Sequence, residues 1–212
     1  MVIGDLKQEQ AESAATEITA AGGRAMGLAV DAMDEASIIA LVEAAVDKYG
    51  ALHIMCNHVG GSNPRKDLDL LRLDMDEFDR TMRLNVRSTV VGSRAALPHL
   101  IAAGGGSIIN TASVGGLSED FLQVAYGTAK AAVIRLTQYV AITHCHSLGQ
   151  PRILRRRCCI SHPMNPVMSR GNAWWWTVEC PATHPLPRTV ETSSRRSRRP
   201  ESKLKQAEQR GP

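Results

Sequence analysis

Hydrophobic positions in the first 142 residues alternate between two spacings. Apolar residues three and four apart, typical of helices with one buried face, predict helices over residues 6–21, 35–49, 76–103 and 124–142. Short apolar runs between them predict strands over residues 1–4, 24–30, 52–56 and 107–111. Gly22 and Gly23 should end the first helix, Asp34 should cap the second, and Pro98 should mark a bend or restart in the third. This alternation indicates an α/β fold, a parallel sheet covered by helices on both faces.

Composition divides the chain near residue 142. Residues 1–142 hold 12 Lys and Arg against 17 Asp and Glu, a net charge of −5, whereas residues 143–212 hold 13 against 4, a net charge of +9. The second part also holds all 3 Trp and shows no convincing helical or alternating spacing beyond His144. We therefore expect a folded domain over residues 1–142 and an irregular basic tail, rich in Arg, Pro and Ser, over residues 143–212.

The sequence offers no membrane or secretory signal. No apolar run reaches the roughly 18 residues of a membrane helix, and the first residues lack the basic and apolar regions of a signal peptide. The odd number of cysteines and the adjacent pair Cys158 and Cys159 argue against a disulfide framework and for a reducing compartment. We expect a cytoplasmic protein with no membrane partner.

Polar residues follow each predicted strand. Asp5, Asp31, residues 57–60 and Ser113 come directly after the four apolar runs. Each of these residue types is common in loops, but ligands in parallel α/β sheets bind beyond the carboxyl ends of the strands. The four strand ends together therefore predict one ligand site.

Tyr126 and Lys130 are four residues apart at the start of the last predicted helix, so a phenol and an ammonium share one helix face. Ser113 ends the strand thirteen residues earlier, and Asn85 lies in Leu84-Asn85-Val86. This set resembles the Asn, Ser, Tyr, Lys tetrad of the short-chain dehydrogenase/reductase family. The resemblance covers about residues 2–142 and includes Asn57-His58-Val59-Gly60 at the place of that family's Asn-Asn-Ala-Gly.

The resemblance implies a role for each member of the tetrad. Tyr126 would be the acid/base; a free tyrosine has a pKa of about 10, and lowering it to about 7 requires roughly 4 kcal/mol, which a cation such as Lys130 and an oxidised nicotinamide can supply. Ser113 would hold the substrate oxygen, and Lys130 would also contact the nicotinamide ribose. Asn85 would hold a water that relays protons; alternatively, it is a helix residue that bonds a local carbonyl. No metal is expected.

The resemblance also implies a cofactor and an assembly. A carboxylate at Asp5 would accept hydrogen bonds from the ribose hydroxyls and repel a 2′-phosphate, which favours NAD over NADP. Asp31 would meet the adenine, and the turn Asn57 to Gly60, with Val59, would pass the adenosine ribose. The helices that contain Asn85 and Lys130 resemble the pair that forms the family's dimer interface, so a homo-oligomer is expected.

Both ends depart from the family pattern. The family's first strand and its Thr-Gly-x-x-x-Gly-x-Gly turn, which receives the pyrophosphate, should precede Val2. The expected fold is therefore an incomplete, Rossmann-like doubly wound sheet whose first strand is missing and whose last strands are replaced by the tail. Such a chain is expected to be a defective fragment, inactive or nearly so and marginally folded, because its sheet lacks a central strand.

The tail admits several interpretations. Its composition is that of a gene translated in a shifted frame; a genuine alternative terminus or a disordered tail would look similar. Six His and Cys residues are candidate zinc ligands: His144, Cys145, His146, Cys158, Cys159 and His162. Their spacing matches no usual pair of zinc ligands. The arginines of the tail could contact phosphates and Trp174 to Trp176 could stack on bases, but a solvated basic tail with an aggregation-prone Trp cluster accounts better for this composition. Nucleic acid is therefore not an expected partner.

The function predicted from these residues is hydride transfer between NAD and a small secondary alcohol or ketone. The sequence does not separate steroid, sugar, acyl and xenobiotic substrates. The alternative is a catalytically silent interaction subunit that keeps the dimer helices but does not bind the cofactor.

Overall fold

The computed structural model describes residues 1–117, 122–144 and 173–180, and side chains are described up to Thr143. The elements follow the predicted alternation: β1 (Val2–Asp5), α1 (Gln8–Ala20), β2 (Met26–Ala29), α2 (Glu35–Tyr49), β3 (Ile54–Asn57), α3 (Met75–Met82), η1 (Arg83–Arg87), α4 (Ser88–Ala102), β4 (Gly106–Ser113), η2 (Val114–Gly116), α5 (Val124–His144) and β5 (Ala173–Cys180). Asp34 caps α2 as predicted, since its side chain accepts from the amide of Ala36.

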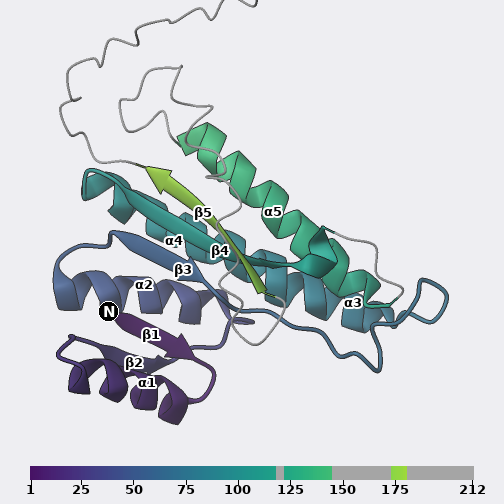
Figure 1. Cartoon of the computed structure of the whole chain (residues 1–212), viewed down its shortest axis with the longest axis horizontal. Helices are drawn as coiled ribbons and strands as arrows, with labels where there is room; N and C mark the ends of the chain where they lie inside the picture. The colour runs from purple at the N-terminus through teal and green to yellow at the C-terminus, as the bar shows by residue number, and fades with distance from the viewer. Residues whose placement is uncertain (118–121, 145–172, 181–212) are drawn as a thin grey trace, which may run out of the picture.

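The strands form two separate sheets. β1 pairs with β2 and β3 pairs with β4, both in parallel, as the alternation predicted. Within the described residues β1 and β3 do not pair with each other. Figure 1 shows the β1–β2 pair between α1 and α2, with α4 and α5 near β3 and β4.

The tail contains one strand that the sequence analysis did not predict. Residues 173–180 form β5, which pairs antiparallel with β4 from Gly106–Cys180 to Ser113–Ala173. Tryptophan, threonine and valine favour extended backbone, and the open edge of β4 offers a row of amides and carbonyls for pairing. Of the zinc candidates, only His144 lies in a described element, as the last residue of α5, and its side chain is not described; the other five zinc candidates and the arginines of the tail lie outside the described residues.

The long helical segment changes pitch at a place that the sequence did not indicate. Pro98 lies inside α4 and does not end it. Instead, α3 runs into α4 through the π-helical segment η1, at whose centre Asn85 is buried. A π-helical turn inside an α-helix places an extra residue in one turn and is often found at functional sites.

The core lies between α2, α4 and the β3–β4 sheet. Its buried centre consists of Val42, Leu52, Ala96, Leu100 and Ile108. No helix in the described part of the chain is long and apolar enough to cross a membrane. Cys56 is exposed, and the cytoplasmic location expected from cysteine usage stays a prediction.

Gly27 allows α1 to lie directly on β2. A Cβ atom at this position would stand 2.3 Å from the backbone carbon of Ala11, which is itself fully buried. We expect Gly27→Ala to lower the free energy of unfolding by about 1 to 3 kcal/mol, because a backbone must move to relieve the overlap. Urea unfolding measures this loss.

Gly115→Ala is the matched control, since its Cβ would meet no atom closer than 3.9 Å. Equal stability of the two variants, within about 0.5 kcal/mol, would contradict the packing of α1 on β2.

Candidate active site

Two glycines bring the end of β4 against the start of α5. A Cβ at Gly116 would lie 2.7 Å from the amide nitrogen of Ala131, and one at Gly127 would lie 2.8 Å from the carbonyl oxygen of Gly115. The backbone of η2 is thus in direct contact with the first turns of α5. This contact places Ser113, the last residue of β4, next to the helix that carries Tyr126 and Lys130.

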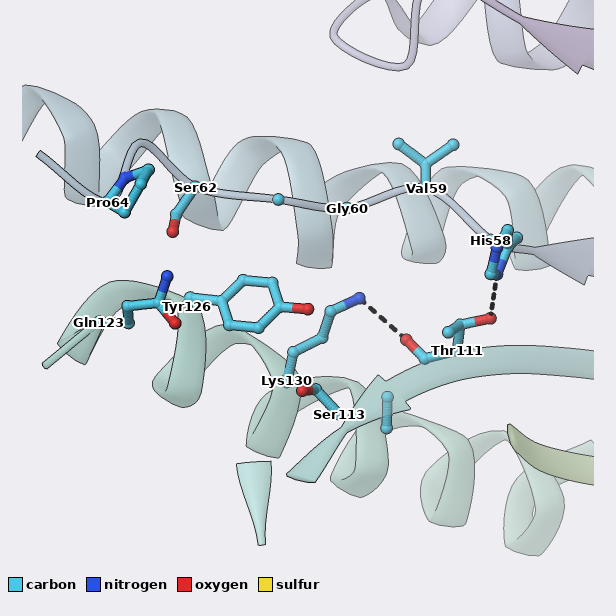
Figure 2. Close-up of a pocket in the computed structure, with 12 residues that line it drawn as sticks. His58, Val59, Gly60, Ser62, Pro64, Thr111, Ser113, Gln123, Tyr126 and Lys130 are labelled. Carbon is cyan, nitrogen blue, oxygen red and sulfur yellow. Dashed lines mark hydrogen bonds between the residues drawn. The ribbon is translucent and has the colours of Figure 1, made fainter. Parts of the chain in front are cut away.

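Lys130 is the buried cation of the site. Its side chain is 3% exposed, and Nζ donates a hydrogen bond to the carbonyl oxygen of Thr111 at 2.9 Å. Nζ also lies 5.6 Å from the centroid of the Tyr126 ring, and Figure 2 shows the Tyr126 hydroxyl directed towards it. Burial lowers the pKa of Lys130 to about 8, so the ammonium still predominates at neutral pH.

Ser113 contributes a hydroxyl to the same cavity. Its side chain is 7% exposed, and Oγ accepts a hydrogen bond from the amide of Gly115 at 3.3 Å. Because Oγ is the acceptor in this bond, its hydrogen remains available for a ligand oxygen. Ser113, Tyr126 and Lys130 line one cavity, as the sequence predicted.

Asn85 holds the segment after β3 next to Lys130. Its Oδ1 accepts from the amide of Gly61 at 3.1 Å, and its Nδ2 donates to the carbonyls of Gly61 and Thr81 at 2.8 and 2.9 Å. A Cβ at Gly60 would lie 2.4 Å from Asn85 Oδ1 and 2.7 Å from Lys130 Nζ. Asn85 therefore bonds a local carbonyl, that of Thr81, as the alternative to a relay role predicted, and it also fixes the segment after β3 through Gly61. A role of Asn85 in a proton relay stays a prediction.

The turn after β3 divides its residues between core and cavity. Val59 and Gly60 line the cavity, together with His58, whose Nδ1 lies 2.8 Å from Thr111 Oγ1. Asn57 does not line it: its Nδ2 donates to Ser93 Oγ at 3.2 Å and to Asn110 Oδ1 at 2.8 Å, deep between β4 and α4. The side chain of Asn57 thus connects β3 to α4 and β4, and the cavity wall begins at the next residue, His58.

Asp5 and Asp31 lie at the carboxyl ends of β1 and β2, outside the residues that line the cavity. Each carboxylate accepts from an amide two residues further on, Asp5 from Lys7 at 2.9 Å and Asp31 from Met33 at 2.8 Å. These bonds fix the orientation of both side chains at the edge where a ligand of a parallel sheet binds.

The cavity has a volume of about 560 Å³. One wall is the extended segment after β3, and the other is the end of β4 with the start of α5 (Figure 2). The sequence did not single out Ser62 or Gln123, which also line it, and it named His58 only as a member of the turn 57–60. Ser62 Oγ is buried with no hydrogen-bond partner among the described residues, and Gln123 has a φ of 64°; neither property has a local sequence signal.

The cavity suits the ribose and ring of a nicotinamide cofactor. A Cβ at Gly60 would fill the space beside Lys130, so glycine leaves the backbone of this wall open to a ligand. Lys130 and Ser113 offer donors to hydroxyl and carbonyl oxygens there. The described residues contain no cluster of His, Cys, Asp and Glu that would hold a metal ion.

Comparison with known proteins identifies the family. The sequence profile described as short chain dehydrogenase matches residues 1–146. The chain belongs to the short-chain dehydrogenase family. It is 36% identical over 141 residues to 7alpha-hydroxysteroid dehydrogenase of Bacteroides fragilis, covering 66% of this chain and 54% of that enzyme. It is 39% identical over 147 residues to 4-formylbenzenesulfonate dehydrogenase of Comamonas testosteroni, covering 69% of this chain and 58% of that enzyme.

Solved short-chain dehydrogenases share the fold. One from Mycobacterium smegmatis superimposes with a TM-score of 0.64 at 28% identity, covering 69% of this chain and 59% of that one. A 7 alpha-hydroxysteroid dehydrogenase in complex with NADH and 7-oxo glycochenodeoxycholic acid gives 0.64 at 27% identity, with 69% and 56% covered. The Rossmann-like α/β fold is thereby confirmed. This chain spans about half the length of the curated relatives it matches.

The pKa of Lys130 predicts how stability depends on pH. It is about 8 in the folded protein, against an ordinary value of 10.5, so between these values the unfolded chain binds more protons. The contribution of Lys130 to the free energy of unfolding therefore rises with pH between about 8 and 10.5. Below pH 8 the charged side chain is buried in the folded protein and destabilises it by the full desolvation cost. We expect the free energy of unfolding of the unmutated chain to rise relative to Lys130→Met between pH 8 and 10.5.

Urea unfolding of the two proteins at a series of pH values checks this. Arg135→Met, which removes an exposed cation from the same helix, is the control and should give a curve parallel to that of the unmutated chain. Parallel curves for Lys130→Met as well would contradict the burial of a charged Lys130.

Proposed function

We propose that this short-chain dehydrogenase segment transfers a hydride between NAD and a secondary alcohol or ketone, with Tyr126 as the acid/base. One observation carries the proposal: a buried ammonium lies 5.6 Å from the Tyr126 ring centroid, in a cavity that Ser113 also lines. Burying a cation is costly unless it is paired and hydrogen-bonded, so a buried cation without a charged partner in a cavity marks a candidate functional group. Here its donors reach the backbone of Thr111 and its charge faces a phenol.

In the oxidation direction, Ser113 donates its free hydroxyl hydrogen to the substrate oxygen and holds it beside Tyr126. The nearby Lys130 ammonium stabilises Tyr126 as the phenolate, which then takes the proton of the substrate hydroxyl and becomes the neutral phenol. The bound cofactor supplies the acceptor for the hydride that leaves the carbinol carbon. In the reverse direction Tyr126 returns its proton to the oxygen of the ketone.

Lys130 links the acid/base to the wall that Asn85 fixes. Its ammonium lies against the backbone of Gly60. The next residue, Gly61, is held in place by its two hydrogen bonds with Asn85. We propose that a water beside Asn85 resupplies the proton of Lys130. A pKa of about 8 suits this exchange, because the group then gives and takes protons close to neutral pH.

The cofactor preference and the assembly are part of the proposal. Asp5, at the end of β1, would bind the ribose hydroxyls of NAD and Asp31 the adenine, with the backbone of residues 57–60 beside the adenosine ribose. The NADH complex of the related 7 alpha-hydroxysteroid dehydrogenase supports a nicotinamide cofactor. Exposed apolar side chains on α4 and α5, at Val90, Tyr139 and Ile142, support a homo-oligomer through these helices.

A silent interaction subunit is the second candidate. Two observations on the described residues favour it. β1 and β3 do not pair with each other, and no glycine-rich turn that could bind a pyrophosphate leads directly from a strand into a helix. Calorimetric titration with NADH separates the two functions. We therefore design the activity tests on the full chain and on a version extended at Met1 by a glycine-rich phosphate-binding strand and turn.

Tyr126→Phe removes the proton carrier and keeps the ring. In the extended protein we expect kcat with NAD and secondary alcohols to fall by at least about a hundredfold, the usual contribution of a general acid/base. NADH affinity should change little. Tyr139→Phe, an exposed position on the same helix, is the control. Retention of more than about a tenth of the rate would exclude Tyr126 as the acid/base.

Asp5→Ser tests the cofactor preference. Serine keeps an acceptor for the Lys7 amide but removes the charge that would repel a 2′-phosphate. We expect the ratio of kcat/KM for NADP to that for NAD to rise by about tenfold or more, since apposed like charges cost several kcal/mol. Glu9→Ser, which removes a carboxylate from the first turn of α1, should leave the ratio unchanged. An unmutated protein that prefers NADP would refute this assignment.

A further inference from the structure

Helix α5 carries Tyr126 and Lys130, yet the residue before it does not cap it. Gln123 has a φ of 64°, which is unusual for a residue with a side chain, and glutamine is not a favoured N-cap. The first bond within the helix runs from the amide of Gly127 to the carbonyl of Gln123, at 2.9 Å. The amides that precede Gly127 therefore need acceptors from another part of the chain.

Asp67 and Leu68, from the loop between β3 and α3, supply all of these acceptors. Their main-chain carbonyls accept from the amides of residues 123 and 124 at 3.1 and 3.4 Å. The carboxylate of Asp67 accepts from the next two amides, Ala125 through Oδ1 at 2.8 Å and Tyr126 through Oδ2 at 2.9 Å. Asp67 is fully buried, so both of its carboxylate oxygens are committed to the start of α5.

The loop itself is fixed on the other side of Asp67. The amide of Asp67 donates to the carbonyl of Asn63 at 2.8 Å, and the amide of Asn63 donates to Glu77 Oε1 at 2.7 Å. Arg80, which bonds the Glu77 side chain, lowers the pKa of that carboxyl to about 2 and keeps it an acceptor. Lys66 and Asp74 close the loop through a backbone bond of 3.1 Å and an ion pair of 2.9 Å.

We propose that Asp67 is the positioning residue of Tyr126, a role that gains its catalytic meaning from the proposed function. Through the Tyr126 amide it fixes the first turn of α5, from which the phenol extends beside Gly115, whose Cβ would stand 3.9 Å from Tyr126 Cδ1. Lys130 lies one turn further on and is tied separately to Thr111. A shift of the first turn therefore moves the phenol relative to both Ser113 and the ammonium.

Fluorine NMR of the full chain labelled with 3-fluorotyrosine tests the proposal without requiring activity. The chain has 3 tyrosines, so Tyr49 and Tyr139 serve as internal references for Tyr126. Asp67→Asn turns one acceptor oxygen into an NH₂ group that faces an amide. We expect it to shift or broaden the Tyr126 resonance alone. Asp69→Asn, at a half-buried position of the same loop whose carboxylate bonds only Leu71 and Arg72 among the described residues, should move none of the three.

A folded Asp67→Asn protein with an unchanged Tyr126 resonance would overturn the proposal, because a cap that serves stability alone lowers the unfolding midpoint without displacing the phenol. If Asp67→Asn abolishes folding, all three resonances collapse, and Asp67→Glu decides. That variant keeps the charge and both acceptors but adds one methylene. We expect a smaller displacement of the Tyr126 resonance; no displacement would again refute the role.

Kinetics of the extended protein separate this proposal from the proposed function. Asp67→Asn should lower kcat by about tenfold to a hundredfold, the cost of misplacing a reacting group by about 1 Å. KM for NAD should stay within about twofold, as expected when a transition-state interaction is lost. An unmutated protein without turnover would refute the proposed function, and the fluorine resonances would still decide whether Asp67 positions Tyr126.

Discussion

The site depends on the close backbone contact between η2 and α5. Gly116 and Gly127 lie where a Cβ atom would come within 2.8 Å of a backbone atom of the opposite element, so neither position tolerates a side chain without moving the helix. This contact joins the end of β4 to the first turns of α5. Ser113, Tyr126 and Lys130 share one cavity because of it, although thirteen residues separate the serine from the tyrosine.

Within this frame the burial of the Lys130 charge is an electrostatic cost. Desolvation lowers its pKa to about 8, and its described hydrogen bond goes to a neutral carbonyl, not to a carboxylate. A neutral partner leaves the charge free to act on the Tyr126 phenol, whereas a carboxylate would compensate it. The fold therefore carries a locally unfavourable group at the point where the proposed chemistry needs a cation, a trade between stability and activity that is common in enzymes.

The sequence predicted the parts of this site that local rules govern. The i, i+4 spacing placed Tyr126 and Lys130 together, and the strand-end rule brought Ser113 to the same edge. Local sequence patterns could not indicate the π-helical turn at Asn85 or the inward side chain of Asn57, because both depend on contacts with distant segments. The cap that Asp67 provides spans 58 residues from a loop without periodicity. β5 was missed because its three adjacent tryptophans show no alternation and because its partner strand, β4, is distant in the sequence.

Direct hydride transfer in the cavity, with Tyr126 as the proton donor, is measured in a single-turnover reaction of the extended protein with C4-deuterated NADH and a prochiral ketone, with the alcohol analysed by mass spectrometry. We expect deuterium on the carbinol carbon of one enantiomer, and we expect Tyr126→Phe to abolish this product on the same timescale. Alcohol without deuterium at that carbon, or the same yield from Tyr126→Phe, would contradict this mechanism.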